Sequence, residues 1–235
     1  MIVYRDHAVT VVNKPSGMLS EPDGTGRDVI TAVREATGTE CRPVHRLDRG
    51  TAGLMVLANT AAAAAALSGA IREGRMEKTY LAAVGGVPEP PEGEMRDLLF
   101  HDAGKNRSYV VRRMRKGVRE ARLTYRTLGS LETENGPLTL VSVTLDTGRT
   151  HQIRVQFATR GMPLVGDRTY GSRFRSPAPA LFSAGLRFPH PATGEQMAFT
   201  AMPDPAQEAW RPAAELLRAL APRTEERAEE GAENG

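Results

Sequence analysis

The stretch Val44-His45-Arg46-Leu47-Asp48-Arg49-Gly50-Thr51-Ala52-Gly53-Leu54 sets one carboxylate among three basic side chains. An apolar run typical of a buried strand follows at residues 53–58. The neighbouring cations favour the ionised form of Asp48. An ionised carboxylate held in a turn beside a buried strand can act as a nucleophile or as a base. The ordinary alternative is a turn aspartate that only pairs with Arg46 or Arg49.

The composition is that of an ordinary folded protein. The 235 residues suit one large domain or two small ones, with 40% hydrophobic and 25% charged residues. No apolar run approaches the roughly 20 residues of a membrane span, and the first residues lack the order of a secretory signal. Cys41 is the single cysteine, which excludes an intrachain disulfide and argues against a cysteine zinc site. We expect a cytoplasmic monomer that binds no membrane.

Positive charge is concentrated in one segment. The net charge is +3, but residues 223–235 carry −3, so residues 1–222 carry +6. Residues 105–126 hold nine basic side chains against Glu120 alone, a net of +8. This concentration favours a polyanionic partner, although a solvated hairpin face would explain it equally well. The candidate phosphate contacts are Lys105, Arg107, Arg112, Arg113, Arg115 and Lys116.

The hydrophobic pattern predicts a mixed, strand-rich α+β chain. Strands are expected at residues 2–4, 9–12, 54–58, 78–84, 138–145, 181–186 and 197–201, and a basic hairpin at residues 108–114 and 121–128. Helices are expected at residues 28–36, 61–73 and 151–160, the last two capped by Thr60 and Thr150. A fourth helix would begin at Asp204 and be kinked or split by Pro212. Residues 223–235 are expected to be a disordered acidic tail.

Two further segments carry side chains suited to a binding pocket. In Glu77-Lys78-Thr79-Tyr80-Leu81-Ala82, strand alternation puts Lys78 and Tyr80 on one face, where the tyrosine ring can pack against a base. Residues 145–157 read LDTGRTHQIRVQF, and His151 and Arg154 share a face at the start of the expected helix. The ordinary alternatives are a core tyrosine for Tyr80 and an inter-element ion pair for Arg154.

Several motifs in this order resemble the RluA family of pseudouridine synthases. They are NKPSGM at residues 13–18, HRLDRGTAGL at 45–54, EKTYLA at 77–82, GRTHQIR at 148–154, GDRTYG at 166–171 and LFSAGLRFPHP at 181–191. The resemblance covers residues 3–201, and chance does not readily produce so many ordered motifs. The sequence departs from the family pattern in two places: Phe182-Ser183 replaces the usual Leu-His, and Ser20-Glu21 stands where a His often falls.

The resemblance implies a fold and a reaction. The fold would be α+β, with a mixed, mainly antiparallel central sheet and flanking helices, and residues 1–222 would form its catalytic domain. The reaction would isomerise uridine to pseudouridine in structured ribosomal or transfer RNA, after the base is flipped out of its stack. The S4-like module of many relatives is not expected before the first strand. The target would then be found with the catalytic domain alone.

Site residues follow from the same resemblance. Asp48 would be the catalytic residue, and Arg154 would pair with it. Tyr80 would line the uracil pocket and take part in proton removal from C5. Arg46 would fill the gap left by the flipped base. The remaining substrate contacts would be His45 and Leu186, with Lys14 on the RNA backbone.

Two other classes of protein compete with this interpretation. A non-catalytic RNA-binding protein of the same fold is the main alternative, although it would not need Asp48, Tyr80 and Arg154 together. A hydrolase that uses Asp48 with His45 or His101 would need an activating partner, which the sequence does not indicate. With no metal-ligand spacing or nucleotide-binding loop in the sequence, we expect no metal and no cofactor.

Overall fold

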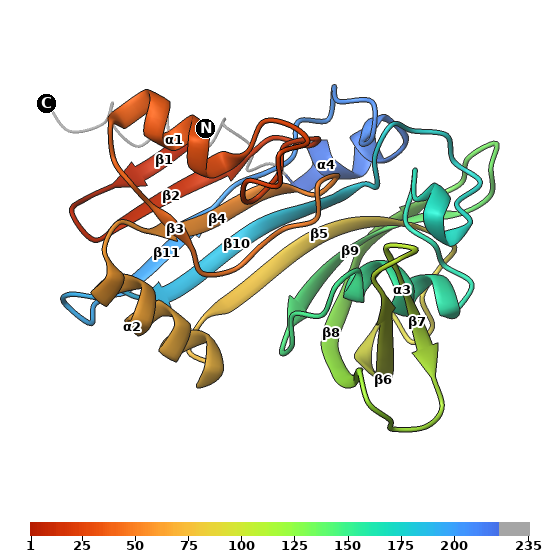
Figure 1. Cartoon of the computed structure of the whole chain (residues 1–235). Coiled ribbons are helices and arrows are strands. Elements are labelled where there is room, and N and C mark those ends of the chain that lie inside the picture. The colour runs from red at the N-terminus through yellow and green to blue at the C-terminus, as the bar shows by residue number, and fades with distance from the viewer. Residues whose placement is uncertain (221–235) are drawn as a thin grey trace, which may run out of the picture.

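The computed structural model describes residues 1–220, which form one curved sheet with helices around it (Figure 1). The strands are β1 (Ile2–Arg5), β2 (Val9–Lys14), β3 (Arg42–Pro43), β4 (Ala52–Ala58), β5 (Glu77–Gly85), β6 (Glu92–Asp102), β7 (Arg107–Val111), β8 (Val118–Leu131), β9 (Leu138–Leu145), β10 (Leu181–Pro189) and β11 (Gln196–Thr200). The helices are α1 (Val29–Thr37), α2 (Ala61–Arg72), α3 (Gln152–Thr159) and α4 (Ala214–Leu220), with short 3-10 turns η1 (Arg168–Tyr170) and η2 (Arg211–Ala213). The expected acidic tail lies outside the described residues.

The strand order brings distant segments together. The sheet runs β1-β2-β4-β10-β5-β9-β8-β6-β7, with β3 added to β4 and β11 to β10. Among residues 1–220, the pairing of β4 with β10 is parallel and the other strand pairings are antiparallel. The expected mixed, mainly antiparallel sheet with flanking helices is therefore confirmed.

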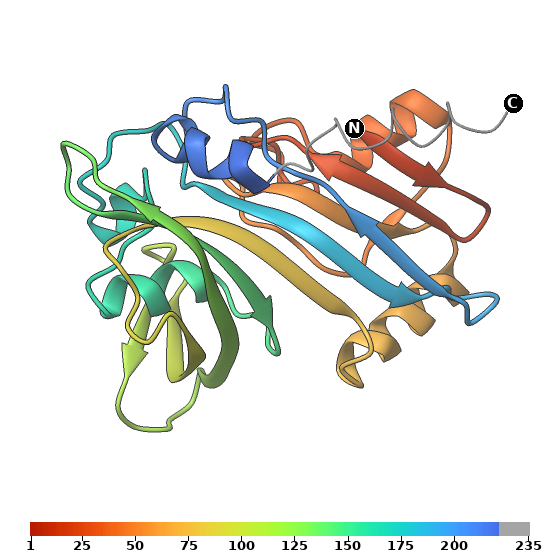
Figure 2. The ribbon, with the colours of Figure 1, turned by 180° about the vertical axis from the view of Figure 1, so that it is seen from behind.

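Apolar side chains cover both faces of this sheet. One face packs α1 and α3 against β4, β5 and β9, through side chains such as Val33, Met55 and Phe157. On the other face, η2 packs against β9 and α4 against β8, and Trp210 and Leu217 join the apolar cluster there, on the side that Figure 2 turns toward the viewer. Helix α2 packs against β4 and β10. Strand β4, which follows the Asp48 turn, is buried along its whole length. Packing on both of its faces therefore anchors the end of that turn in the core.

Two of the predicted helix starts are confirmed and one is wrong. The Asp28 side chain caps α1 at Thr31 N–H, and the Thr60 hydroxyl caps α2 at Ala63 N–H. Thr150 does not cap α3. His151 occupies that position instead, in the left-handed conformation at φ 56°, and its side chain makes no capping bond.

The predicted basic hairpin is also wrong. Strands β7 and β8 do not pair with each other, because β6 lies between them and pairs with both. Strand β6 is difficult to predict from the sequence, because only Met95 and Leu99 are buried among its eleven residues. With so few core positions, strand alternation gives little signal. The turn between β6 and β7 and the segment between β7 and β8 therefore lie at opposite ends of β7.

The C-terminal helix begins later than expected. Residues after Asp204 form turns, and the regular helix α4 starts only at Ala214. Pro212 lies in the first turn of η2, directly before α4, so it marks the start of the helical segment rather than a kink within it.

Gly53 allows the close approach that aligns β4 with β10. Its φ is 113°, and a Cβ built there would lie 2.4 Å from the Ser183 carbonyl oxygen. The two strands pair only where Ala52 and Gly53 face Phe182 and Ser183. A glycine is therefore required five residues after Asp48, at the point where the Asp48 turn joins the sheet.

Candidate active site

A pocket of about 340 Å³ opens beside Asp48. Its wall is formed by the turn before β4, by β5, by the segment that leads into α3, and by the start of β10. Apolar side chains such as Leu47, Ile153 and Leu181 face it together with charged groups. A concave site of this size and mixed lining suits a small, largely flat ligand that also carries polar atoms.

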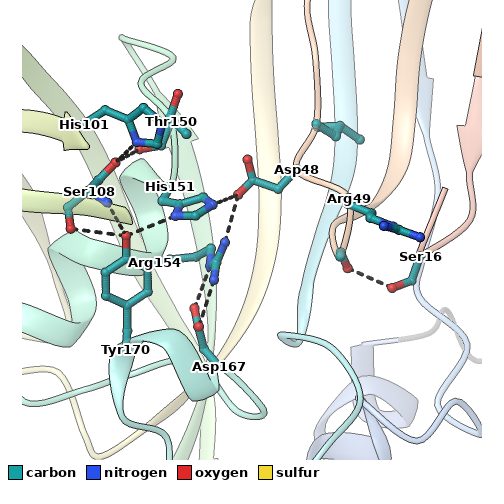
Figure 3. A network of polar contacts seen from close by, with 12 residues as sticks. Ser16, Asp48, Arg49, His101, Ser108, Thr150, His151, Arg154, Asp167 and Tyr170 are labelled. Carbon is teal, nitrogen blue, oxygen red and sulfur yellow. Dashed lines mark hydrogen bonds and ion pairs between the residues drawn. The ribbon is translucent and has the colours of Figure 1, made fainter. Parts of the chain in front are cut away.

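Asp48 receives its partners from α3, about a hundred residues later in the chain. Arg154 donates from Nη1 to Asp48 Oδ2 at 3.3 Å, and His151 Nε2 lies 3.7 Å from the same oxygen. Figure 3 shows both side chains pointing toward the carboxylate. The contact expected between Arg154 and Asp48 is confirmed. The Asp48 side chain is still 26% exposed, so a ligand in the pocket can reach it.

Arg154 is held mainly by a second carboxylate, Asp167. Its Nε and Nη2 donate to the two Asp167 oxygens at 2.6 and 2.9 Å, and both residues are buried (Figure 3). Burial alone would lower the pKa of Arg154, but the bonds to Asp167 outweigh it and raise that pKa. The sequence interpretation missed this role of Asp167, although the residue lies in the GDRTYG motif.

His151 is oriented by Tyr170. The Tyr170 hydroxyl lies 3.1 Å from His151 Nδ1 and accepts a hydrogen bond from Ser108 N–H at 2.8 Å. The same hydroxyl also lies 3.2 Å from the Ser108 carbonyl oxygen, to which it can donate its single proton. If it does, His151 Nδ1–H donates to the hydroxyl; if the proton goes to Nδ1 instead, the ring proton is on Nε2 and faces Asp48. Burial, more than any other factor, lowers the pKa of His151. The Tyr170 contact thus holds a largely buried His151 ring against Asp48, and the left-handed backbone of His151 is a strained geometry of the kind found at functional sites.

The cations beside Asp48 in the sequence are not its partners, which corrects the sequence interpretation. Arg46 is directed outward, 75% exposed, and pairs with Glu21 at 3.2 Å. Arg49 donates to the Gly17 carbonyl at 3.0 Å, and Figure 3 shows it pointing away from Asp48. Adjacent positions in a turn diverge, so closeness in the sequence did not predict closeness of the side chains.

Lys14 is also placed differently from the expectation of an RNA backbone contact. It is fully buried, and its Nζ donates to the carbonyl oxygens of Met18, Pro15 and Arg49 at 2.7, 3.2 and 3.2 Å. Burial lowers its pKa to about 8, although the Asp48 carboxylate opposes that shift. Lys14 therefore ties the loop after β2 to the Asp48 turn and cannot touch a phosphate at the surface.

Comparison with known proteins places this site in a family. The model of the RNA pseudouridylate synthases matches residues 8–159. The dual-specificity RNA pseudouridine synthase RluA of Haemophilus influenzae is 35% identical over 209 residues, covering 86% of this chain and 93% of that protein. RluA of Escherichia coli K12 is 34% identical, covering 87% of this chain and 93% of its own.

The chain belongs to the RNA pseudouridylate synthase family. Members of this family are isomerases. The fold agrees, because the human RNA pseudouridylate synthase domain-containing proteins 4 and 1 align with TM-scores of 0.74 and 0.73. Their sequence identities are 21% and 24%, and each alignment covers over nine-tenths of both chains.

As a pseudouridine synthase, the chain presents Tyr80 but not Leu186 to the pocket. Tyr80 lies on β5 in the pocket wall, and burial followed by the nearby Asp48 carboxylate raises its pKa. Leu186 is fully buried in the core with Phe188 and does not line the pocket. A register shift in β10 between Ser183 and Gly185 separates the two ends of that strand, so Leu181 is the β10 side chain at the pocket.

The basic side chains of this pseudouridine synthase divide into two groups. Apart from the buried Lys14, the side chains predicted as phosphate contacts are exposed: Lys105, Arg107, Arg112, Arg113, Arg115 and Lys116. Arg107 lies near the site, since its guanidinium is 5.4 Å from the Tyr170 ring centre. Lys78 and Arg149 line the pocket itself, and the sequence interpretation gave neither of them a role. Residues 1–220 contain no group of three or more His, Cys, Asp or Glu side chains arranged to hold a metal ion.

His45 has a structural contact as well as a position in the pocket wall. Its Nε2 accepts a hydrogen bond from Val56 N–H at 3.1 Å, beyond the point where β4 and β10 cease to pair. Burial, followed by the charge of Lys78, lowers the pKa of His45 to about 3. A neutral ring at this pKa cannot serve as an acid at neutral pH.

Proposed function

We propose that this protein isomerises uridine to pseudouridine in structured ribosomal or transfer RNA, with Asp48 as the catalytic group. The main support is an accessible carboxylate at the end of a pocket about the size of a nucleoside, held by Arg154 and faced by His151 and Tyr80. The reaction breaks the N1–C1′ bond, turns the uracil and joins C5 to C1′. One nucleotide supplies every atom, so we expect no cofactor.

The substrate base must leave its stack to enter this pocket. Arg46 is well placed to occupy the space that the base leaves, because its side chain is exposed at the pocket rim and, within residues 1–220, bonded only to Glu21. A surface ion pair of this kind contributes about 1 kcal/mol or less, so it can be exchanged for RNA contacts at little cost.

Asp48 keeps enough negative charge to react. Arg154 lies between two carboxylates but is bonded bidentately to Asp167, so Asp48, Asp167 and Arg154 together carry a net charge of −1. Asp48 is thus oriented without being fully neutralised. From this position it could attack C1′ or C6, or remove a proton from C2′.

The pKa of the Tyr80 hydroxyl depends on the charge of Asp48. In the resting site, burial and the Asp48 carboxylate keep its hydroxyl protonated. Formation of a bond between Asp48 and the nucleoside would remove that negative charge. The pKa of Tyr80 would then fall, which would make it a better base for the C5 proton late in the reaction.

We further propose that the enzyme acts as a monomer in the cytoplasm.

The test is site-resolved pseudouridine mapping of RNA from cells with and without this gene, together with purified enzyme on the RNAs identified. Loss of pseudouridine at one or a few loop positions, restored by the enzyme in vitro, is the expected result. Tight RNA binding without any isomerisation would instead identify a non-catalytic binding protein of the same fold.

A further inference from the structure

We propose that Lys78 forms a subsite in this pocket that binds a backbone phosphate of the substrate RNA beside the flipped nucleotide. The inference rests on the proposed function and extends it, because it assigns one particular phosphate contact to the interior of the pocket. That contact is separate from the exposed basic side chains of residues 105–116.

Lys78 is a cation without a partner in the described part of the chain. It lies on β5, half-buried in the pocket wall, and its ammonium group makes no hydrogen bond or ion pair within residues 1–220. Its neighbour Glu77 faces Arg187 at 3.7 Å instead. Burial lowers the pKa of Lys78, so part of its hydration is lost without compensation. An anion in the pocket would restore the missing interactions.

His45 provides a second, independent sign of an anion site. Because its Nε2 accepts from Val56 N–H, the ring proton is on Nδ1. That Nδ1 is buried and has no hydrogen-bond partner in residues 1–220. Lys78 is close enough for its charge to act on the ring. Lys78 and His45 both line the pocket, and within residues 1–220 neither Lys78 Nζ nor His45 Nδ1 has an acidic partner.

The spacing along β5 fits an RNA backbone. Lys78 and Tyr80 are two residues apart on the same face, which is roughly 6.6 Å in a strand. Tyr80 lies beside Asp48, where the base and ribose would be, so Lys78 is one step removed from the reacting atoms. Gly148, which also lines the pocket, lies close to Lys78, because a Cβ there would be in ordinary contact with Nζ at 3.7 Å. A lysine at this distance suits the point charge of a phosphate.

The test neutralises phosphates one at a time. A synthetic RNA stem-loop that the wild-type enzyme modifies is prepared with a single methylphosphonate at each position around the target uridine. For the wild-type enzyme, we expect one flanking position to weaken binding by about tenfold, as for a lost charged hydrogen bond. Lys78→Met should weaken binding of unmodified RNA by a similar factor and be insensitive to methylphosphonate at that position.

Two control variants make the result specific. Lys116→Met removes an exposed lysine outside the pocket and should keep the full penalty at the same phosphate. Lys78→Arg retains the charge and should also keep it, which guards against a folding defect in Lys78→Met. The inference is overturned if the wild-type enzyme shows no flanking-phosphate penalty, or if Lys78→Met keeps that penalty. Absence of pseudouridine formation by the wild-type enzyme would overturn the proposed function itself.

Discussion

At the scale of single residues, the site depends on how Arg154 divides its hydrogen bonds. Two of its nitrogens are committed to Asp167 and a third reaches Asp48. The bidentate pair fixes the plane of the guanidinium. The remaining N–H is therefore already directed at Asp48, and the contact costs little further conformational entropy. The GRTHQIR motif predicted that Arg154 would contact Asp48, and this contact is confirmed. Asp167 was missed because nothing in the sequence says which of many acidic residues will lie behind that arginine.

Tyr80→Phe should separate binding from turnover. The phenyl ring still packs in the pocket wall, so affinity for RNA should change little. Loss of the hydroxyl should lower single-turnover isomerisation by about 100-fold or more, the usual range for a lost proton-transfer group. Turnover is measured by release of tritium from C5-labelled RNA. Unchanged turnover would mean that Tyr80 only packs in the pocket wall and takes no part in proton transfer.

Lys14→Met should show a pH-dependent stability difference. The folded-state pKa of Lys14 is about 8, below the ordinary 10.5, so the folded protein loses this proton first as the pH rises. The cost of burying the charge is present below pH 8 and disappears between about pH 8 and pH 10.5. The wild-type protein should therefore gain about 2 kcal/mol relative to Lys14→Met between pH 7 and pH 9.5. Urea unfolding at both pH values measures this; an equal difference at the two pH values would be inconsistent with a buried, titrating lysine.

At the scale of elements, the turn that carries Asp48 is positioned by the strand that follows it. The sequence predicted β4 well, because a run of consecutive apolar residues indicates burial on both faces. It also predicted α1 and α2, whose caps are local signals. It failed for β6 and for the start of α3, where contacts from remote elements decide the structure: β6 has few core positions, and His151 is oriented by Tyr170.

Gly53→Ala should disrupt the alignment of β4 with β10. The new Cβ would meet the Ser183 backbone at 2.4 Å, and the residue has a positive φ. We expect a loss of at least about 3 kcal/mol in the free energy of unfolding, or failure to fold. Gly38→Ala is the matched control, because Gly38 also has a positive φ but no atom would lie within 4 Å of the added Cβ. It should cost only about 1 kcal/mol. Similar losses in both variants would argue against a steric role for Gly53.

At the scale of the whole molecule, strand order assembles the site. The segments around Asp48, Tyr80 and Arg154 meet because β4, β10 and β5 are neighbours in the sheet and α3 packs on the same face. The resemblance of the motifs predicted which residues would meet. Periodicity alone could not, because a strand's pattern reports which face is buried and not which strand lies beside it.

The exposed basic side chains should govern the salt dependence of RNA binding. Arg112, Arg113 and Arg115 lie between β7 and β8, at the opposite end of β7 from Arg107. Reversing all three charges should flatten the slope of log affinity against log salt by about two to three units, since each phosphate contact contributes roughly −0.7 to −0.9. Isomerisation at saturating enzyme should change little.

A salt titration of both proteins on one stem-loop tests this expectation. The control reverses Arg27 and Arg34, each of which already faces a glutamate, at 3.7 and 3.8 Å respectively. Equal slopes in the wild-type protein and the triple variant would mean that this segment is only a solvated surface.

The most direct test of the account is the single change Asp48→Asn. The amide keeps the shape of the side chain and can still accept from Arg154, but it cannot act as a carboxylate nucleophile or base. Tritium release from C5-labelled RNA and RNA affinity are measured on the same preparation. We predict no detectable pseudouridine and an affinity within a few-fold of the wild-type value. Activity within tenfold of the wild-type enzyme would contradict the central claim that Asp48 is the catalytic group.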